Sequence, residues 1–169
     1  MILAFDTYYF DNKAKTVALT FKNWEDSIEQ NIFSEVLENV EEYTSGEFYK
    51  RELPCILSLI KKLNPEVIEL IIIDGFVYLS DDLKKGLGAY LYESLNQKVP
   101  IIGVAKTDFI SLKSNKRLLL RGESKNPLYI TAIGIDLDTA TSNIQLMHGE
   151  YRIPTLLKRL DMITKEKLS

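Results

Sequence analysis

Three acidic residues lie at the boundaries of apolar stretches of the sequence. Asp6 follows the run 2–5, Asp74 follows the run 70–73, and Glu52 comes just before a helical pattern. An ionised carboxylate near the inside of a sheet is costly unless a cation or hydrogen bonds compensate it. Mg²⁺ keeps several waters and takes only one or two carboxylates, which suits acids from separate elements. We therefore interpret Asp6, Glu52 and Asp74 as one divalent-metal site.

Phosphodiester hydrolysis is the chemistry that these residues fit. It needs a nucleophilic water, neutralised charge in the transition state and a stabilised leaving oxygen, and magnesium ions supply all three. Lys106 ends another apolar run, where its ammonium group can pair with a ligand carboxylate or a phosphate oxygen. The simpler alternative is that Asp6, considered alone, accepts hydrogen bonds from backbone amides at a strand end.

The composition is that of an ordinary globular protein, and it limits the kinds of site. Of the 169 residues 46% are hydrophobic and 27% are charged, and we expect one domain over residues 1–169. A single cysteine and a single histidine exclude an internal disulfide, a thiolate metal cluster and a zinc-type site. Any metal is therefore held by oxygen atoms.

The expected location follows from the apolar runs, which are all short and interrupted by charge. None reaches the roughly 20 residues that cross a membrane, and no basic region precedes the first apolar stretch. We therefore expect a cytoplasmic monomer without a membrane partner.

The charge of the chain bears on its partners. A net charge of −3 does not favour nucleic-acid binding as a strongly basic domain would, so phosphate contacts have to be local. The best local candidate is a segment with five positive charges, although such a segment is by default a solvated strand face and loop. These residues are Lys113, Lys116, Arg117, Arg121 and Lys125.

The first part of the chain is predicted to begin an antiparallel sheet. Residues 1–10 and 15–21 are rich in branched and aromatic side chains, and the segment 11–13 between them is typical of a turn, which together predict a β-hairpin. A third strand is predicted within residues 27–37, although residues 35–42 fit the start of a helix equally well.

Strands and helices alternate in the middle of the chain. A helix is predicted over residues 54–63, with Glu52 at its entrance or just before it, because proline tolerates only the first turn of a helix. Residues 66–74 and 99–105 are typical of strands that are buried on both faces, and residues 82–97 between them show a helical pattern.

The last part of the chain adds two strands, over residues 116–121 and 128–135. Two helices are predicted after them, over residues 138–148 and 154–165, the first capped by Asp138 or Thr139.

This order of elements predicts an α/β fold. A hairpin followed by strands joined through helical crossovers favours a mixed sheet with antiparallel first strands, then parallel strands, and helices on both faces, as in the ribonuclease H-like architecture. If the first strand and the strand over residues 66–74 are central neighbours, their carboxyl ends lie about 5 Å apart laterally. Asp6 and Asp74 then converge, with Glu52 approaching from the helix entrance.

Several segments of the chain resemble endonuclease V, a metal-dependent nuclease family with a ribonuclease H-like core. The segment 5–9 (FDTYY) is similar to the first-strand acidic motif of the family, and the segment 43–52 (YTSGEFYKRE) keeps its tyrosine-to-glutamate interval. The Asp-Gly pair at 74–75 is similar to that after the next family strand, and the segment 102–106 (IGVAK) matches a family motif almost verbatim. Two C-terminal segments also resemble the family: 126–128 (NPL) and 149–154 (GEYRIP).

The resemblance implies a divergent, shortened member of this DNA-repair nuclease family. Such a protein hydrolyses DNA or RNA near inosine, which is deaminated adenosine, and uses Mg²⁺, with Mn²⁺ as a substitute. The resemblance makes Asp6, Glu52 and Asp74 the metal ligands, and Lys106 a catalytic charge near the scissile phosphate. Tyr43 is implied as part of a wedge beside an extruded base. The other residues that we expect at the substrate are Tyr9, Gly46, Gly75, Lys116 and Arg117.

Two departures from the family pattern leave the base specificity open. After the Asp-Gly pair the family has a glycine-rich stretch and a histidine, whereas this chain has the segment 76–80 (FVYLS), and a second family histidine is replaced near Ile133 or Gly134. The alternative is therefore a nucleic-acid-binding protein of the same fold with altered or lost catalysis and altered base specificity. A phosphoacceptor receiver domain also has strand-end acids and a later lysine, but it has a helix where this chain has a hairpin after Asp6.

Overall fold

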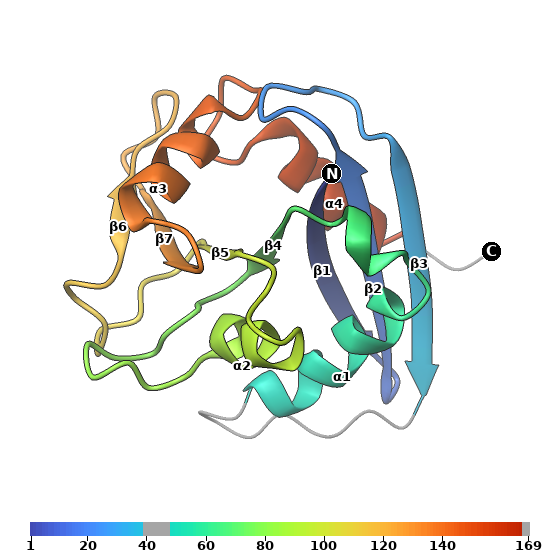
Figure 1. Cartoon of the computed structure of the whole chain (residues 1–169). Helices are drawn as coiled ribbons and strands as arrows, with labels where there is room; N and C mark the ends of the chain where they lie inside the picture. Colours follow the sequence, from blue (N-terminus) through green and yellow to red (C-terminus); the bar gives the residue numbers. More distant parts are fainter. Residues whose placement is uncertain (39–47, 167–169) are drawn as a thin grey trace.

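A mixed seven-stranded sheet lies at the centre of the computed structural model, which describes residues 1–38 and 48–166 (Figure 1). Its strands lie in the order β3-β2-β1-β4-β5-β7-β6. β1, β4 and β5 are parallel to one another, and the other neighbours pair antiparallel, so the predicted fold class is confirmed. The strands are β1 (Ile2–Phe10), β2 (Lys13–Phe21), β3 (Asn31–Glu38), β4 (Leu70–Asp74), β5 (Ile101–Ala105), β6 (Arg117–Leu119) and β7 (Leu128–Ile133).

The hairpin of β1 and β2 follows from its two turn residues. Asp11 and Asn12 have φ angles of 46° and 60°, a left-handed conformation that Asp and Asn adopt more readily than other side chains. Such a turn matches the twist of the flanking strands, which pair along their whole lengths. The third predicted strand is β3, and it continues to Glu38 where a helix start had been the alternative. Residues 39–42 lie outside the described residues.

Four helices in the described part of the chain cover the two faces of this sheet. α1 (Phe48–Ile60) and α2 (Leu87–Ser94) pack on one face and lie next to each other in Figure 1, whereas α3 (Leu137–Leu146) and α4 (Thr155–Thr164) pack on the other. Alternate residues of each central strand enter the two apolar cores. In β1, for example, Leu3 faces α1 and α2 while Ala4 faces α3 and α4.

The start of α1 differs from the prediction. The helix begins at Phe48 and continues through Pro54, so Glu52 lies inside the helix and not at its entrance. A proline in a helix removes one backbone hydrogen bond and disfavours the preceding turn. Packing holds that turn in place, because Tyr49 stacks on Tyr90 of α2 with 3.9 Å between the ring centres and Glu52 is buried.

Several elements are shorter than predicted because turns occupy their ends. β4 begins at Leu70, since a short 3₁₀ helix, η1 (Pro65–Val67), takes up the residues before it. α2 covers residues 87–94 and not 82–97, because Leu83 has a φ angle of 61° within a turn that Tyr78 and Lys85 close by a β-bridge.

The cap of α3 is also different from the prediction. The carboxylate of Asp136 accepts the backbone N–H of Thr139 at 3.0 Å, so the N-cap is Asp136 and neither Asp138 nor Thr139. The helix therefore begins at Leu137, one residue earlier than expected.

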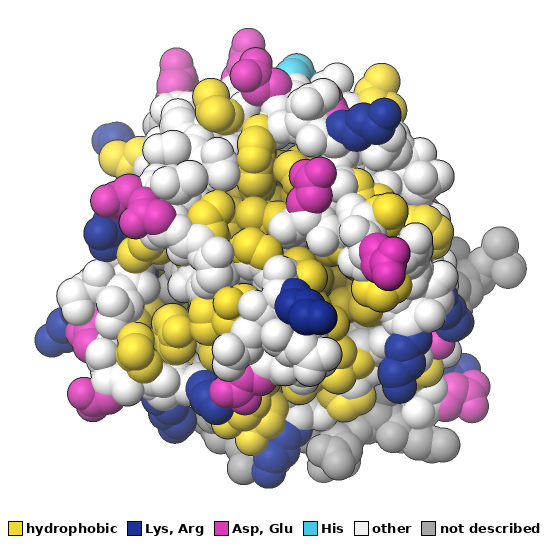
Figure 2. Space-filling model, viewed as in Figure 1, with side chains coloured by type: hydrophobic (Ala, Val, Ile, Leu, Met, Phe, Trp, Pro, Cys, Tyr) yellow, Lys and Arg dark blue, Asp and Glu magenta, His cyan; other side chains and the backbone are white. Residues whose placement is uncertain are grey.

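Charged and apolar side chains are mixed on the surface. On the face seen in Figure 2, acidic and basic side chains are scattered among hydrophobic ones and are not gathered by sign. Among residues 1–38 and 48–166, none of the helices has the length and hydropathy needed to cross a bilayer.

Candidate active site

Asp6 and Asp74 are neighbours on the two central strands β1 and β4. β1 and β4 are parallel neighbours whose register pairs Phe5 with Ile73, and the next residue along each strand is an aspartate. The expected neighbour relation of these two strands is thus confirmed. β4 ends at Asp74, whereas β1 continues beyond Asp6 to Phe10, so the two acids lie where the parallel pairing of these strands ends. Sheets of this kind bind ligands at the carboxyl ends of their parallel strands.

Burial and mutual repulsion make Asp6 a weak acid in the folded protein. Loss of solvent contact, and then the charge of Asp74, raise the pKa of Asp6 to about 7 from its ordinary value of 3.8. The backbone N–H of Thr7 donates to Oδ1 of Asp6 at 2.9 Å, which opposes the shift only in part. The hydroxyl group of Thr164 donates to Oδ2 at 3.5 Å. In the absence of a cation, this carboxylate is therefore poorly compensated.

Glu52 approaches the same strand ends from α1 and is almost fully buried, with 3% of its surface exposed. Burial raises its pKa well above the ordinary value, and the charges of Asp6 and Asp74 raise it further, against a hydrogen bond with Thr7. The structure thus brings the three predicted acids within electrostatic range of one another. Glu52 is the innermost of them.

A fourth acid, Asp161 of α4, belongs to this cluster and was missed in the sequence. It raises the pKa of both Asp6 and Asp74, in addition to the burial of those residues. Oδ1 of Asp161 lies 3.9 Å from the Lys106 ammonium group and 3.1 Å from that of Lys165. The positive charge of Lys106 in turn lowers the pKa of Asp74, so this ammonium group lies close enough to interact with the acids.

The donor set fits a magnesium ion that is held by few protein ligands. Within residues 1–38 and 48–166, no three His, Cys, Asp or Glu side chains are arranged to hold a metal ion between them, so the structure does not show Asp6, Glu52 and Asp74 as the joint three-ligand site that the sequence predicts. Mg²⁺ does not need such a cage, since one or two carboxylates, waters and substrate phosphates complete its shell. A cavity of about 30 Å³, room for a species the size of a water molecule, is lined mostly by apolar side chains, with Asp6, Asp74, Lys106 and Asp161 also in its wall.

Tyr9 lies under the guanidinium group of Arg51, whose central carbon is 3.4 Å from the centre of the ring. Burial, followed by the negative charge of Glu52, raises the pKa of the Tyr9 phenol. Tyr9 is therefore packed beside the acidic cluster, and its role in substrate binding stays a prediction. Tyr43 and Gly46 lie outside the described residues.

Two basic residues that are expected at the substrate form ion pairs within the protein. They are Lys116 and Arg117. Lys116 is 8% exposed, and its ammonium group is paired with Asp108. Arg117 donates through Nε to Asp138 at 2.8 Å. Contacts of either residue with nucleic acid stay a prediction.

Arg121, from the same basic segment, is buried at 3% exposure and holds the loop before α4. Its Nη atoms donate to the backbone carbonyl oxygens of Met147 and Tyr151, both at 2.6 Å, and of Gly149 at 3.3 Å. This loop leads into the helix that carries Asp161. The charge of Arg121 is therefore used inside the protein.

We expect Arg121→Met to lower the free energy of unfolding by about 2–4 kcal/mol, because several buried carbonyl oxygens lose a charged donor at once. The matched control is Arg117→Met, which breaks an exposed ion pair and is expected to cost less than about 1 kcal/mol. Urea unfolding of both variants measures the difference. Equal losses would contradict the structural role of Arg121.

A second, larger cavity opens next to Asp74 and Lys106. It has a volume of about 420 Å³, and its walls come from α1, the loop after β4, the start of α2 and the loop after β5. Gly75, one of the residues expected at the substrate, lies in its wall. Its φ angle of 138° is a conformation that residues with a side chain rarely adopt.

The loop after β4 is fixed against the neighbouring strands. The backbone N–H of Val77 donates to the hydroxyl group of Thr131 on β7 at 2.9 Å. A Cβ atom on Gly103 of β5 would come within 2.5 Å of both the Gly75 carbonyl oxygen and the Thr131 hydroxyl oxygen. The absence of a side chain at Gly103 therefore lets this loop cross β5 closely and sets the position of the cavity.

Comparisons with known proteins give matches for the structure only. No protein-family model matches the sequence, and no curated protein matches it significantly. Endonuclease V from Streptomyces avermitilis matches with a TM-score of 0.73 at 21% identity, over 97% of this chain and 79% of that one. Endonuclease V from Ciona intestinalis, in complex with DNA that contains an inosine followed by a ribo-adenosine, matches with a TM-score of 0.79 at 18% identity, over 97% and 84%.

A weaker structural match is to a protein of another kind. Argonaute from Marinitoga piezophila, in complex with a guide RNA, matches with a TM-score of 0.57 at 14% identity, over 98% of this chain and 29% of that one. At these identities the likenesses show the fold, which is the ribonuclease H-like fold that endonuclease V structures share. The predicted architecture is thereby confirmed.

Proposed function

We propose that this protein is a metal-dependent endonuclease that hydrolyses a phosphodiester bond in nucleic acid near inosine. The observation that carries the proposal is the neighbouring pair Asp6 and Asp74, at the point where the parallel pairing of β1 and β4 ends and where burial and repulsion raise the pKa of both carboxyl groups. Such a pair is unfavourable for folding alone and is compensated when a cation binds. The fold shared with endonuclease V structures, one of them in complex with inosine-containing DNA, supports the choice of substrate.

The chain's own groups have distinct parts in this proposal. Asp6 and Asp74 would hold Mg²⁺, or Mn²⁺ in its place, and Glu52, which the sequence predicts as the third ligand, lies buried near them. A bound Mg²⁺ supplies a low-pKa water, charge neutralisation at phosphorus and stabilisation of the leaving oxygen. Lys106 places a positive charge at the same edge, where it can meet a non-bridging phosphate oxygen. Asp161 holds Lys106 toward the cluster at 3.9 Å.

A second candidate is a nucleic-acid-binding protein that has lost catalysis. The observation in its favour is that no three acids of the described residues are arranged to hold a metal ion. Under this alternative, binding of an oligonucleotide survives chelation and no cutting follows when metal is added. The acids would then be retained without a cation, which leaves their cost to folding unexplained.

The test is a cleavage panel of labelled DNA and RNA strands that carry inosine, uracil, a mismatch or no lesion. We expect cutting near inosine with Mg²⁺ or Mn²⁺ and none with a chelator, since the carboxylates need a divalent ion. The catalytically silent control is Glu69→Gln, an exposed acid at the opposite end of β4. Retained binding without any metal-dependent cutting would select the second candidate instead.

A further inference from the structure

Arg152 joins three segments that lie far apart in the sequence. Its Nη2 atom donates to the backbone carbonyl oxygen of Lys106, and to that of Pro127 at 2.8 Å. Lys106 is the first residue after β5, Pro127 comes directly before β7, and Arg152 belongs to the loop between α3 and α4. One guanidinium group therefore connects the strand end that carries Lys106 with the loop that leads into the helix of Asp161.

This bridge lies where the backbone pairing of β5 and β7 ends. The last pair of the two strands is Ala105 with Tyr129. Pro127 has no N–H group, so the ladder of backbone hydrogen bonds cannot continue through it. The guanidinium group of Arg152 reaches both segments at this point, and hydrogen bonds from an ionised donor are stronger than those between neutral groups. Arg152 thus fixes the backbone of Lys106 just beyond the paired part of the sheet.

The loop that carries Arg152 is itself held in place. Arg121 donates to the carbonyl oxygen of Tyr151 at 2.6 Å and to that of Arg152 at 3.4 Å. A Cβ atom on Gly122 would come within 2.2 Å of the carbonyl oxygen of Glu150, so the segment after β6 packs directly on this loop. The side chain of Arg152 therefore extends from a backbone that is already fixed, and it can transmit that position to the end of β5.

The side chain of Lys106 has few contacts of its own that hold it. It is 42% exposed, and among the described residues its ammonium group forms one ion pair, with Asp161 at 3.9 Å. An ion pair between partly exposed groups at this distance contributes little, and a lysine side chain has many rotamers. The place of the ammonium group therefore depends on where the backbone of Lys106 lies.

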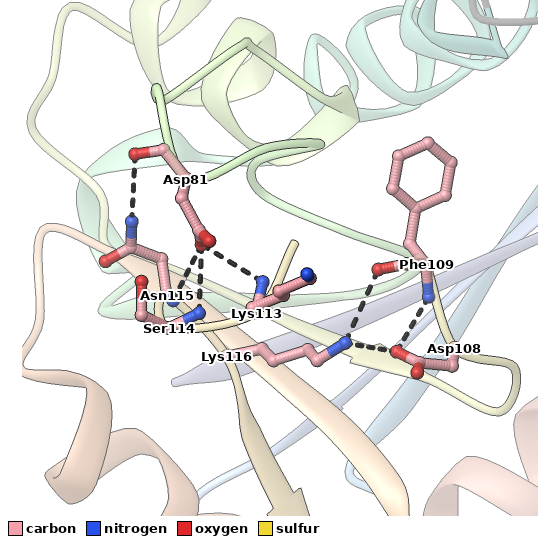
Figure 3. A network of polar contacts seen from close by, with 7 residues as sticks. All are labelled: Asp81, Asp108, Phe109, Lys113, Ser114, Asn115 and Lys116. Atoms are coloured by element: carbon pink, nitrogen blue, oxygen red, sulfur yellow. Dashed lines mark hydrogen bonds and ion pairs between the residues drawn. The ribbon is translucent and has the colours of Figure 1, made fainter. Parts of the chain in front are cut away.

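The far part of the loop after β5 is fixed separately, by the polar network in Figure 3. One carboxylate oxygen of Asp81, in the loop after β4, accepts three backbone N–H groups of this loop at 3.0, 2.9 and 3.3 Å. They belong to Lys113, Ser114 and Asn115. The Lys116 ammonium group pairs with Asp108 in the same network. Asp81 and Arg152 thus hold different parts of one loop, which allows their effects to be compared.

We propose that Arg152 is a positioning residue for Lys106. By fixing the backbone of Lys106, it keeps the ammonium group beside Asp161 and Asp74, where the proposed reaction places the phosphate. The inference rests on the proposed function and deepens it, because it assigns the placement of this charge to the loop before α4. A charge stabilises a transition state through preorganised geometry, and a displacement of about 1 Å can cost about a hundredfold in rate. Arg152 itself does not touch the substrate.

A double-mutant cycle on the cleavage rate tests this coupling. We expect Arg152→Met to lower kcat on an inosine-containing strand about a hundredfold, with a smaller change in KM. In the Lys106→Met background the same change is expected to lower kcat less than about twofold, since the charge that Arg152 positions is already absent. An equal loss in both backgrounds would overturn the proposal, because Arg152 would then affect cleavage without Lys106.

Two matched variants separate positioning from a general loosening of the protein. Arg159→Met also removes an arginine, but one whose partner is Glu29, and it is expected to keep kcat within about twofold of the wild type. Asp81→Asn weakens the far part of the loop after β5 and is expected to cost far less than Arg152→Met. A loss in Asp81→Asn as large as that in Arg152→Met would show that any loosening of the loop suffices, and the role of Arg152 would be refuted. Thermal melting confirms that the variants are folded.

Hydrogen exchange distinguishes a failure of this inference from a failure of the proposed function, because it needs no catalysis. Peptides of the metal-free protein are followed by mass spectrometry. In Arg152→Met we expect residues 105–112 to exchange at least about fivefold faster than in the wild type, with β2 unchanged. Unchanged exchange after β5 would overturn the inference even in a protein that cuts. Faster exchange in a protein that cuts no strand would refute the proposed function, while Arg152 would still position Lys106.

Discussion

Asp6→Asn is expected to abolish metal-dependent cleavage and, at the same time, to make the metal-free protein more stable. Asparagine keeps an oxygen that accepts the Thr7 N–H, but it carries no charge. It therefore removes the repulsion with Asp74 and the cost of burying an anion, both of which raise the pKa of Asp6 to about 7. At pH 7.5 we expect the free energy of unfolding in a chelator to rise by roughly 1–3 kcal/mol.

The same change is expected to lower the cleavage rate by about a thousandfold or more, since a divalent ion supplies several kcal/mol of transition-state stabilisation. Thermal melts with and without Mg²⁺ give a second readout, because the wild type is stabilised by the ion and the variant is not. Glu69→Gln removes an exposed carboxylate and is expected to change neither the cleavage rate nor the stabilisation by Mg²⁺. A less stable Asp6→Asn protein that still cuts would contradict the assignment of Asp6 to a metal site.

The direction of its pKa shift sets Asp6 apart from an acid that stabilises the fold. A carboxylate retained for folding, such as the helix cap Asp136, has a lowered pKa because backbone amides donate to its charged form. Asp6 and Asp74 show the reverse shift, with burial as the largest cause in both. Such a loss of folding stability through buried charges is common at binding sites, where a bound ligand restores the stability.

The convergence of Asp6 and Asp74 could be predicted from the sequence because both residues end apolar runs of parallel neighbours. The position of Glu52 within its helix is predicted wrongly, because Pro54 is typical of a helix start. The stack of Tyr49 on Tyr90, which holds the turn before Pro54, has no signal in the local sequence. Asp161 had a weak signal: it follows the inward-facing Leu157 by four residues and so places an acid on an apolar helix face.

The contacts of Arg121, in the basic segment, and of Asp81 could not be predicted from the local sequence pattern. Nothing in the spacing of its positive charges indicates that Arg121 points inward to four carbonyl oxygens, because these partners lie 26 to 31 residues away. The carboxylate of Asp81 likewise accepts three backbone N–H groups of a loop more than 30 residues further along the chain. Such pairings are properties of the tertiary structure.

Metal-free protein is expected to lose stability as the pH rises from 5 to 8. The pKa of Asp6 is about 7 in the folded protein and about 3.8 when the chain is unfolded. Between these values the folded state keeps a proton that the unfolded state has released, so raising the pH favours unfolding. Asp6 alone accounts for about 2 kcal/mol between pH 5 and 7, and the raised pKa values of Glu52 and Asp74 act in the same direction.

Mg²⁺ is expected to reverse this trend, because the proposed site binds the ion through deprotonated carboxylates, for which protons compete. The stabilisation by Mg²⁺ is therefore expected to be small at pH 5 and to grow toward pH 8. Urea unfolding at several pH values in this range, with a chelator or with Mg²⁺, measures both curves, and Asp6→Asn should flatten both. Acids with lowered pKa values, such as Glu29 beside Arg159, contribute below this range and cannot imitate the effect. A chelated protein that becomes more stable between pH 5 and 8 would show that the strand-end acids are compensated by the protein itself, and the metal site would then have no physical basis.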